Sequence, residues 1–458
     1  MEKEEIQLAL DTQRKFFNSG KTFDPDFRIE VLKKLRSRIL QYEPEIREAM
    51  WKDFHKPAFE VIATETGFMM KEINLAIRKL RKWSRPKRVR TPLVHFPAWS
   101  YIRPQPYGQV LVLSPWNYPF QMSFLPMIGA LAAGNCVVLK VSRQVPCSTA
   151  VMEKILAGIP QELVLMMNGD HDVSEFLLSY KFDYIFFTGS IKVGKYVMQK
   201  AAENLIPVSL ELGGKNPCVV AEDARLDYAA KRIAWGKFLN AGQTCICTDY
   251  VLVDNKIKDR FLALLAEEIR SYYGENPENS NDYARIIHPE NTERISALMK
   301  NGQIVIGGTV DRENCFVAPT VIKGVTPDDP VMQEEIFGPV LPVIGFDDFD
   351  EVYGIIARNP NPLATYIFTR DKKRARAFLQ KTRSGSAAIN ETVLQIASPY
   401  LPYGGTGSSG MGRYHGLKSF ETFSNMRSVL VKSNLLDIPL RYPPYNRLKE
   451  NVVRYLMR

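Results

Sequence analysis

The sequence has few cysteines, few histidines and no long uninterrupted hydrophobic segment. Six cysteines in 458 residues are too few for a disulfide framework, which favours a reducing, cytoplasmic environment. The five histidines are scattered without the spacing of metal ligands, so no metal site is expected. The longest nearly apolar run, 124–139, is interrupted by one proline and two glycines. It is shorter than the roughly 20 residues needed to span a bilayer, so no transmembrane segment is expected.

No secretory signal is expected at the N-terminus, because Met1 is followed by acidic residues and no apolar core. The net charge of +10 is concentrated in 78–90, which holds eight lysines and arginines and no acid. The rest of the chain therefore carries only +2. No aromatic platform or nucleic-acid-binding motif accompanies the basic run, so we expect a solvated connector and no nucleic-acid partner.

The composition, 45% hydrophobic and 24% charged, is that of a globular protein, and the length favours two or three domains. Short apolar strands alternate with helical segments, which predicts α/β domains with parallel, doubly wound sheets. The predicted strands are 108–113, 137–139, 163–166 and 184–187 in a first set, and 217–220, 251–253 and 364–368 in a second set with helices at 227–238 and 258–271.

Helical periodicity marks both ends of the chain. Apolar residues recur at helical spacing in 30–50, with a break at Pro44, and again in 62–83. Four apolar residues recur at the same spacing in the tail, 441–458, which predicts a docked surface helix.

One cysteine, Cys245, stands in the small, polar, turn-prone segment 240–245. A thiol whose thiolate is stabilised can act as a nucleophile, and covalent catalysis then needs a base to release the product. Glu211 is a candidate for that base, because glycines follow it and leave its carboxylate uncrowded. The two residues are too far apart for one helix face, so the fold must bring them together.

Eight motifs, in this order along nearly the whole chain, resemble the aldehyde dehydrogenases, and the last two resemble the class 3 branch that acts on fatty and aromatic aldehydes. They are Pro-Trp-Asn-Tyr-Pro at 115–119, Gly-Asn-Cys-Val-Val-Leu-Lys at 134–140, Phe-Thr-Gly-Ser at 187–190, Leu-Glu-Leu-Gly-Gly-Lys at 210–215, Asn-Ala-Gly-Gln-Thr-Cys at 240–245, Glu-Ile-Phe-Gly-Pro at 335–339, Gly-Met-Gly-Arg-Tyr-His-Gly at 410–416 and Lys-Ser-Phe-Glu-Thr-Phe at 418–423.

The resemblance implies an aldehyde dehydrogenase-like α/β fold with two doubly wound domains and a β extension between the subunits of a homodimer. The expected divisions are a Rossmann-like cofactor-binding domain (1–83 and 104–208), a catalytic domain (209–395), and a bridging oligomerisation extension with the C-terminal tail (84–103 and 396–458). The implied activity is NAD(P)-dependent oxidation of an aliphatic or aromatic aldehyde to its carboxylic acid. A non-catalytic binding protein of the same fold is the alternative.

The resemblance also implies roles for individual residues. Cys245 attacks the aldehyde, Asn117 stabilises the oxyanion with the backbone N–H of Cys245, and Glu211 activates the water that hydrolyses the thioester. For the cofactor, Lys140 and Glu335 are implied at the riboses. The remaining implied contacts are Gly189 and Ser190 at the pyrophosphate, Phe337 at the nicotinamide, and Trp116 beside it.

Two residues depart from the pattern of these relatives. Arg143 stands where they commonly carry an acid that binds the adenosine ribose, and an arginine suits a 2′-phosphate, so we expect NADP to be used at least as well as NAD. Cys247 stands where they usually have no thiol. It either packs, which we favour, or forms a reversible link to Cys245 if the segment is extended. The other cysteines, Cys136, Cys147, Cys218 and Cys315, are expected to be small core residues.

Two glycine-rich segments resemble nucleotide motifs. Segment 405–410 has the glycine spacing of a dinucleotide fingerprint, but it follows 398–402, whose prolines exclude a central strand. We expect a flexible loop near the mouth of the active site. Segment 189–195 would be a P-loop if Tyr196 were a serine or threonine. Its amides still suit a phosphate, and a nucleotide hydrolase is the weaker alternative.

Overall fold

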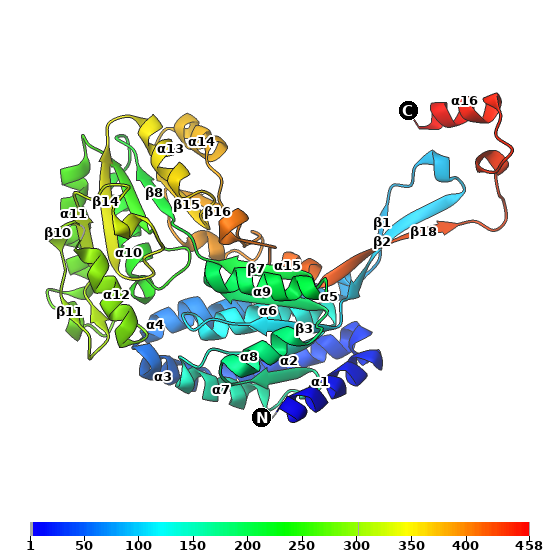
Figure 1. Cartoon of the computed structure of the whole chain (residues 1–458), viewed down its shortest axis with the longest axis horizontal. Coiled ribbons are helices and arrows are strands. Elements are labelled where there is room, and N and C mark those ends of the chain that lie inside the picture. The colour runs from blue at the N-terminus through cyan, green and yellow to red at the C-terminus, as the bar shows by residue number, and fades with distance from the viewer. Residues whose placement is uncertain (1–2, 301, 458) are drawn as a thin grey trace.

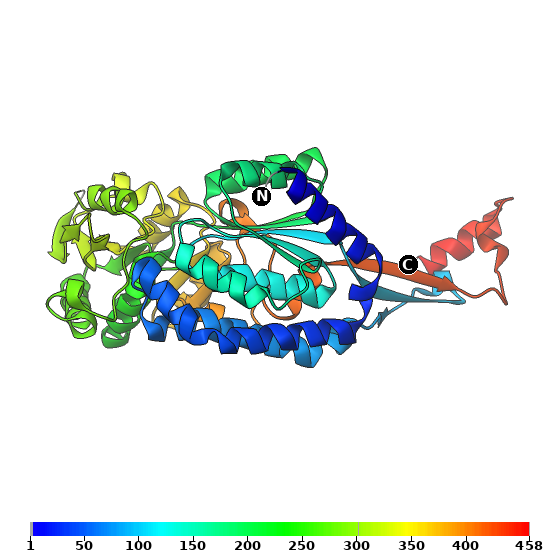
Figure 2. The same cartoon turned by 90° about the horizontal axis from the view of Figure 1, so that it is seen from below.

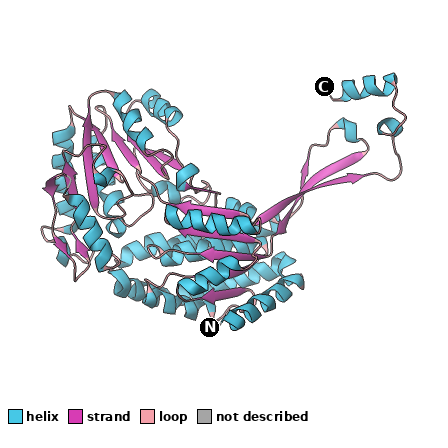
Figure 3. Ribbon diagram, viewed as in Figure 1, coloured by secondary structure: helices cyan, strands magenta, loops and turns pink. Residues whose placement is uncertain are grey.

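Two α/β units lie side by side in the computed structural model, which describes residues 3–300 and 302–457. An arm of β-strands projects from one unit and carries the C-terminal helix away from both (Figure 1, Figure 2). Strands form the centre of each unit and helices cover them (Figure 3). The predicted α/β class with parallel sheets is confirmed.

The first unit contains a six-stranded sheet of order β17-β7-β6-β3-β4-β5. Neighbours from β7 to β5 are parallel, and β17 joins the edge antiparallel to β7. The strands are β3 (Gln109–Leu113), β4 (Cys136–Lys140), β5 (Val164–Met167), β6 (Tyr184–Gly189), β7 (Val208–Leu212) and β17 (Gly410–Met411). Every residue of β3 is buried, as expected for a parallel strand that helices cover on both faces.

One helix of this unit, α6 (Pro119–Ala133), is buried along all 15 of its residues. It lies between the sheet and two outer helices, so it has no polar face, and it explains the apolar run predicted not to span a membrane. The other helices are α1 (Lys3–Asn18), α2 (Pro25–Gln41), α3 (Glu43–Phe54), α4 (Ala58–Val61), α5 (Gly67–Trp83), α7 (Pro146–Leu156), α8 (His171–Ser179) and α9 (Ile191–Glu203). Within the described residues, no helix is both long and apolar enough to cross a membrane.

The second unit contains a seven-stranded sheet of order β10-β13-β14-β9-β8-β15-β16, parallel except for β10. Its strands are β8 (Pro217–Val220), β9 (Tyr250–Asp254), β10 (Gln303–Ile306), β13 (Thr320–Lys323), β14 (Val340–Phe346), β15 (Ala364–Phe368) and β16 (Ser386–Ile389), and a small ribbon joins β11 (Val310–Asp311) to β12 (Phe316–Val317). Its helices are α10 (Leu226–Phe238), α11 (Lys258–Tyr273), α12 (Pro289–Met299), α13 (Phe349–Arg358) and α14 (Lys372–Lys381). Each strand and helix predicted from the pattern coincides with one of these elements within a few residues.

The arm is a three-stranded antiparallel sheet of β1 (Lys87–Val89), β2 (Ala98–Pro106) and β18 (Ser424–Lys432). The short helix α15 (Leu417–Thr422) leads into β18. The basic run lies at the base of this arm, where Arg81 binds Asp26 and Arg88 stacks over Trp99. It is therefore a connector between helix and strand, as predicted.

The tail forms the predicted helix, α16 (Arg447–Leu456), beside the short turn η3 (Leu93–His95) of the arm. Its predicted docking is wrong for a single chain. Leu448 is 72% exposed and Val453 38% exposed. Because β18 leads the chain outward along the arm, the apolar face of α16 is left uncovered.

Candidate active site

Cys245 follows a tight loop between α10 and β9. Three consecutive residues of this loop have positive φ: Asn240 at 54°, Ala241 at 51° and Gly242 at 74°. This backbone region is strained for alanine, so surrounding contacts must hold it. One such contact is the buried carboxylate of Glu60, which accepts a 2.9 Å hydrogen bond from the Asn240 N–H.

A fully buried ion pair supports the same loop through the ring of Tyr118. The Lys56 ammonium lies 3.1 Å from the Glu65 carboxylate and 3.7 Å from the centre of the Tyr118 ring. The Tyr118 hydroxyl is hydrogen bonded to the Thr244 hydroxyl at 2.6 Å, one residue before Cys245. A buried ion pair is stable only when both charges are well partnered, and here each charge has a partner.

Asn216 forms hydrogen bonds with the backbone on the other side of the loop. Its side-chain amide donates to the carbonyls of Cys245 at 2.8 Å and Cys247 at 3.0 Å. Its amide oxygen accepts from the N–H of Ala364 at the start of β15 at 2.8 Å. The backbone around Cys245 is therefore tied to the second sheet.

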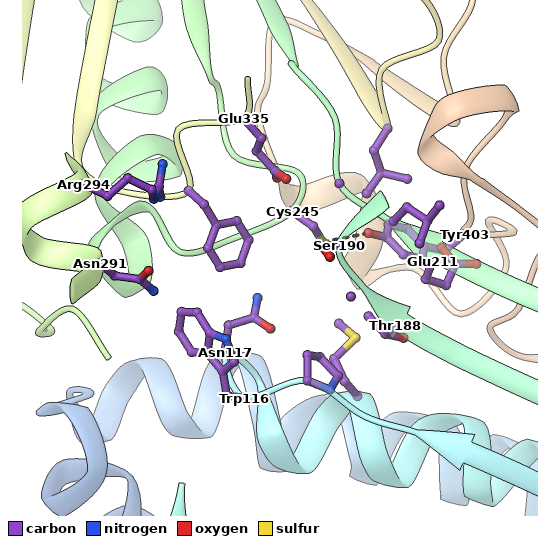
Figure 4. A pocket seen from close by; sticks show the side chains of 17 residues that line it. Trp116, Asn117, Thr188, Ser190, Glu211, Cys245, Asn291, Arg294, Glu335 and Tyr403 are labelled. Carbon is purple, nitrogen blue, oxygen red and sulfur yellow. Dashed lines mark hydrogen bonds between the residues drawn. The ribbon is translucent and has the colours of Figure 1, made fainter. Parts of the chain in front are cut away.

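The three predicted catalytic residues line one cavity of about 270 Å³ (Figure 4). Glu211 comes from β7 in the first unit, Asn117 from the loop after β3, and Cys245 from the second unit. The cavity thus lies where the two units meet, and the fold brings together residues that are remote in the sequence.

Glu211 is buried, and neither carboxylate oxygen has a hydrogen-bond partner within the described chain. Burial raises its pKa well above the ordinary value, and the positive charge of Arg413 opposes this shift only in part. An unpartnered carboxylate that faces a cavity can accept a proton from a water molecule there.

Asn117 is held by the loop that precedes Cys245. Its side-chain amide donates to the Gln243 carbonyl at 3.0 Å, and its own carbonyl accepts from the Asn240 side chain at 3.0 Å. A primary amide has two N–H donors, so one of them is free to serve a ligand in the cavity.

Five residues predicted to contact the pyrophosphate, a ribose or the nicotinamide of the cofactor also line this cavity. They are Trp116, Gly189, Ser190, Glu335 and Phe337. The Trp116 and Phe337 rings meet edge to face at 5.5 Å. Burial raises the pKa of Glu335 to about 8, and the charge of Asp249 adds to the effect.

Lys140 and Arg143 line a second, neighbouring cavity of about 860 Å³, together with Lys192 and Lys195 from the start of α9. Ser190 caps this helix, since its hydroxyl accepts from the Val193 N–H at 3.4 Å. A helix N-terminus beside four cationic side chains fits the phosphates of a dinucleotide. The two cavities lie on either side of the β6–α9 turn, so these residues fit an extended dinucleotide.

Segment 405–410 has no such geometry. It forms a short 3-10 turn, and Gly410 then pairs with Glu211 across β17 and β7. No α-helix follows whose N-terminus could face a pyrophosphate, so the fingerprint is excluded here. The segment lies beside the site as predicted, but it is paired into the first sheet rather than forming a free loop.

A third cavity, of about 440 Å³, reaches Cys245 from the opposite side. We call it the apolar channel. Its lining is mostly aliphatic and aromatic and includes Phe59, Ile62, Phe68, Trp235, Leu239 and Leu394. Cys245 lines both this channel and the polar cavity.

The chain matches the model of the aldehyde dehydrogenase family over residues 1–429. The chain belongs to the aldehyde dehydrogenase family. It is 42% identical to the 4,4'-diaponeurosporen-aldehyde dehydrogenase of Staphylococcus aureus, with 96% of each chain covered. It is 41% identical to aldehyde dehydrogenase family 3 member B1 of Homo sapiens, over 95% of this chain and 94% of the relative.

Other matches agree. The dimeric NADP-preferring aldehyde dehydrogenase of Canis lupus familiaris is 41% identical, over 96% of this chain and 98% of the relative. The structure of the substrate-bound state of Staphylococcus aureus AldH has a TM-score of 0.96 at 41% identity and covers 99% of both chains. This aldehyde dehydrogenase therefore oxidises aldehydes with NAD or NADP, and the non-catalytic alternative is not favoured.

Cys247 does not meet the condition for a link to Cys245. Its N–H binds the Thr244 carbonyl at 2.9 Å, so the segment is a turn and not an extended strand. Its sulfur donates to the Gly242 carbonyl at 3.4 Å and is buried. Packing, the favoured interpretation, agrees with this geometry. Among the other cysteines, Cys136 and Cys218 are buried core residues, whereas Cys147 and Cys315 are only partly buried.

Several residues around the candidate site were not predicted from the sequence: Lys56, Glu60, Glu65, Asn216 and Tyr403. Asn216 directly follows the 210–215 motif, so its position could have been noticed. Lys56, Glu60 and Glu65 look like ordinary surface residues of a helical region, and only their complete burial distinguishes them.

Proposed function

We propose that Cys245, Asn117 and Glu211 carry out aldehyde oxidation in two stages. In the first, the Cys245 thiolate bonds to the aldehyde carbon, and the carbonyl oxygen becomes an oxyanion that accepts from the Asn117 amide and the Cys245 N–H. When bound, NAD(P) would supply the hydride acceptor, and loss of the hydride from that carbon would leave a thioester on the Cys245 sulfur. The observation that carries this proposal is the shared cavity of Cys245 and Glu211.

In the second stage, Glu211 takes a proton from a water molecule whose oxygen attacks the thioester carbon. The carbon–sulfur bond then breaks, which releases the carboxylic acid and restores the thiolate. The unpartnered state of the Glu211 carboxylate supports this role, because no protein donor competes for its lone pairs.

Glu211→Gln tests the second stage separately from the first. We expect a normal burst of reduced cofactor in the first turnover and a fall of about 10²–10³-fold in steady turnover. Stopped-flow absorbance of the reduced nicotinamide measures both phases. Equal loss of the two phases would contradict the assignment, and Glu203→Gln, on the surface of α9, is the control.

The same variant has a pH signature. Burial raises the pKa of Glu211, and a base works only when ionised, so wild-type steady turnover falls as the pH drops through a pKa above the ordinary 4.5. In Glu211→Gln this fall in steady turnover at low pH disappears. Its persistence would mean that another group is the base.

We infer that NADP is used at least as well as NAD. Burial lowers the pKa of Lys140, and the positive charge of Arg143, which lines the same cavity, acts in the same direction. A 2′-phosphate between them would relieve that repulsion through charge-assisted bonds. The relative from Canis lupus familiaris is named as NADP-preferring, which supports this choice.

We also propose a medium-chain, long-chain or aromatic aldehyde as the substrate. The apolar channel supports this class, because burial of each methylene contributes about 0.8 kcal/mol. A panel of aliphatic and aromatic aldehydes, assayed with each cofactor, identifies the best substrate. A preference for acetaldehyde over every longer aldehyde would contradict the proposal.

A homodimer is proposed from the arm. Trp99, Leu430 and Leu435 are 43%, 51% and 99% exposed, and a second copy that covers the arm would bury them. Sedimentation of the wild type and of Leu430→Asp tests this, with loss of the dimer expected in the variant. Free cysteines throughout the described chain support a cytoplasmic location.

The proposed divisions are 1–83 with 104–208 for the cofactor, 209–395 for catalysis, and 84–103 with 396–458 for bridging. Pairing of β7 with β6 supports a first division that extends to Leu212. Limited proteolysis between the two sheets would test this boundary.

A further inference from the structure

Tyr403 is placed directly against the nucleophile. Its hydroxyl oxygen lies 3.2 Å from the Cys245 sulfur, and its side chain lines the same cavity as Glu211 (Figure 4). This distance is that of a hydrogen bond to sulfur. Tyr403 is therefore in contact with the atom that the proposed function assigns to covalent attack.

The Tyr403 ring is held rigidly in this position. It stacks on the His415 ring with centres 5.3 Å apart and planes 16° apart, and it meets the Tyr414 ring edge to face at 5.6 Å. The backbones of Tyr403 and Tyr414 exchange two hydrogen bonds, of 3.0 and 2.8 Å. A donor held in place before the reaction needs no reorganisation when charge develops.

The surroundings of the sulfur oppose its ionisation. Burial raises the pKa of the Cys245 thiol to about 12, and nearby negative charges add to the shift. The titratable groups that act on this thiol, apart from Tyr403, are Glu211, Glu335, Cys247, Tyr118 and Tyr414. A thiolate in this place consequently needs a hydrogen-bond donor.

Tyr403 meets that need because it keeps its own proton. Burial raises its pKa well above the ordinary value, and the charges of Cys245 and Glu211 act in the same direction. His415 cannot provide a cation in its place, since burial lowers the pKa of that ring to about 3. A thiolate can only accept, so the phenol must be the donor in their hydrogen bond.

We propose that the Tyr403 hydroxyl is a catalytic hydrogen-bond donor that stabilises the Cys245 thiolate before and during attack on the aldehyde. This inference rests on the proposed function of Cys245. The proton that the thiol loses passes to water, and Tyr403 releases none. The hydroxyl acts only on the first stage, because Glu211 activates the water of the second.

The test compares Tyr403→Phe with Tyr414→Phe. Both variants remove one hydroxyl from the same buried aromatic cluster, but the Tyr414 hydroxyl faces the Met122 sulfur at 3.6 Å and not Cys245. The measurement is the rate at which iodoacetamide alkylates the Cys245 peptide, followed by mass spectrometry from pH 6 to 10. We expect Tyr403→Phe to be about tenfold slower at each pH, and Tyr414→Phe to match the wild type.

A second variant provides the test if Tyr403→Phe does not fold. 3-Fluorotyrosine at position 403 keeps the ring and makes the hydroxyl a stronger donor, so alkylation should become faster. An unchanged alkylation profile in Tyr403→Phe, or in the fluorotyrosine protein if the former is unfolded, overturns the proposal. Equal slowing in Tyr414→Phe also overturns it.

The same experiments separate this proposal from the proposed function. In Tyr403→Phe the burst of reduced cofactor should slow by the same factor as alkylation, whereas Glu211→Gln slows only steady turnover. If Cys245→Ala retained aldehyde oxidation, the proposed function would fail whatever the alkylation rates. If Cys245→Ala is inactive and Tyr403→Phe has a normal burst, only the role of Tyr403 fails.

Discussion

The two cavities that meet at Cys245 differ in their linings. The polar cavity holds the buried Glu211 carboxylate, which has no hydrogen-bond partner within the described chain, together with Asn117 and Glu335, whereas the apolar channel is lined mostly by aliphatic and aromatic side chains. The polar groups face the place where charge develops, and the apolar groups face the place where only chain length and width matter. The comparison indicates that the chemistry and the choice of substrate depend on separate residues on the two sides of one sulfur.

The buried ion pair of Lys56 and Glu65 beside the Cys245 loop gives the largest expected effect. Lys56→Met leaves the Glu65 carboxylate buried without its cation, so we expect a loss of about 3–5 kcal/mol in the free energy of unfolding. The denaturant midpoint measures this loss. Because Tyr118 would also lose its contact with the ammonium, the burst rate should fall as well.

Two controls sharpen the Lys56 prediction. The double variant Lys56→Met, Glu65→Leu removes both charges and should recover most of the lost stability. Lys52→Met breaks an exposed pair with Glu48 and should have no measurable effect. If Lys56→Met behaved like Lys52→Met, the ion pair would not support the loop of the nucleophile.

On the polar side, Arg143→Glu should lower kcat/KM for NADP by about 30-fold and change it for NAD by less than about twofold. The reason is that a charge-assisted bond to the 2′-phosphate becomes a repulsion. Initial rates with each cofactor at saturating aldehyde measure the ratio. Lys181→Glu, exposed and outside the basic cavity, is the charge-matched control, and an equal loss with both cofactors contradicts the NADP proposal.

On the apolar side the expected effect is smallest. Leu394→Asp places a charge in the half-exposed part of the channel and should lower kcat/KM for octanal by about fivefold while acetaldehyde is unaffected. Leu205→Asp, at a 91% exposed position, is the control. An equal loss for the two aldehydes would show that the channel does not select by chain length.

Prediction from the sequence succeeded where a pattern has a single physical cause. Strands β3, β4 and β6 are continuous apolar runs, because parallel strands are buried on both faces. Strand β7 was not predicted, since Ser209 and Glu211 interrupt its apolar run. The arm was expected only from the resemblance, because an exposed strand such as β18 has no core-facing pattern.

The site residues also include some that the sequence indicated and others that it did not. The residue types of Cys245 and Glu211 already suggested a nucleophile and a base, whereas the role of Asn117 was proposed from the resemblance of its motif to the aldehyde dehydrogenases. Tyr403 stands in no motif, and a tyrosine after a proline indicates nothing about a sulfur elsewhere in the chain.

What the linear order of residues contains is therefore the chemistry of the reacting groups and the alternation of strands and helices, both of which are local properties. The contacts around the site are not local. Tyr403 and Cys245, whose side chains touch, are 158 positions apart in the sequence, and Asn240 and Glu60 are 180 positions apart. Burial and orientation depend on how the two sheets pack, so the pKa values of Cys245 and Glu211 and the separation of the two cavities arise only in the folded molecule.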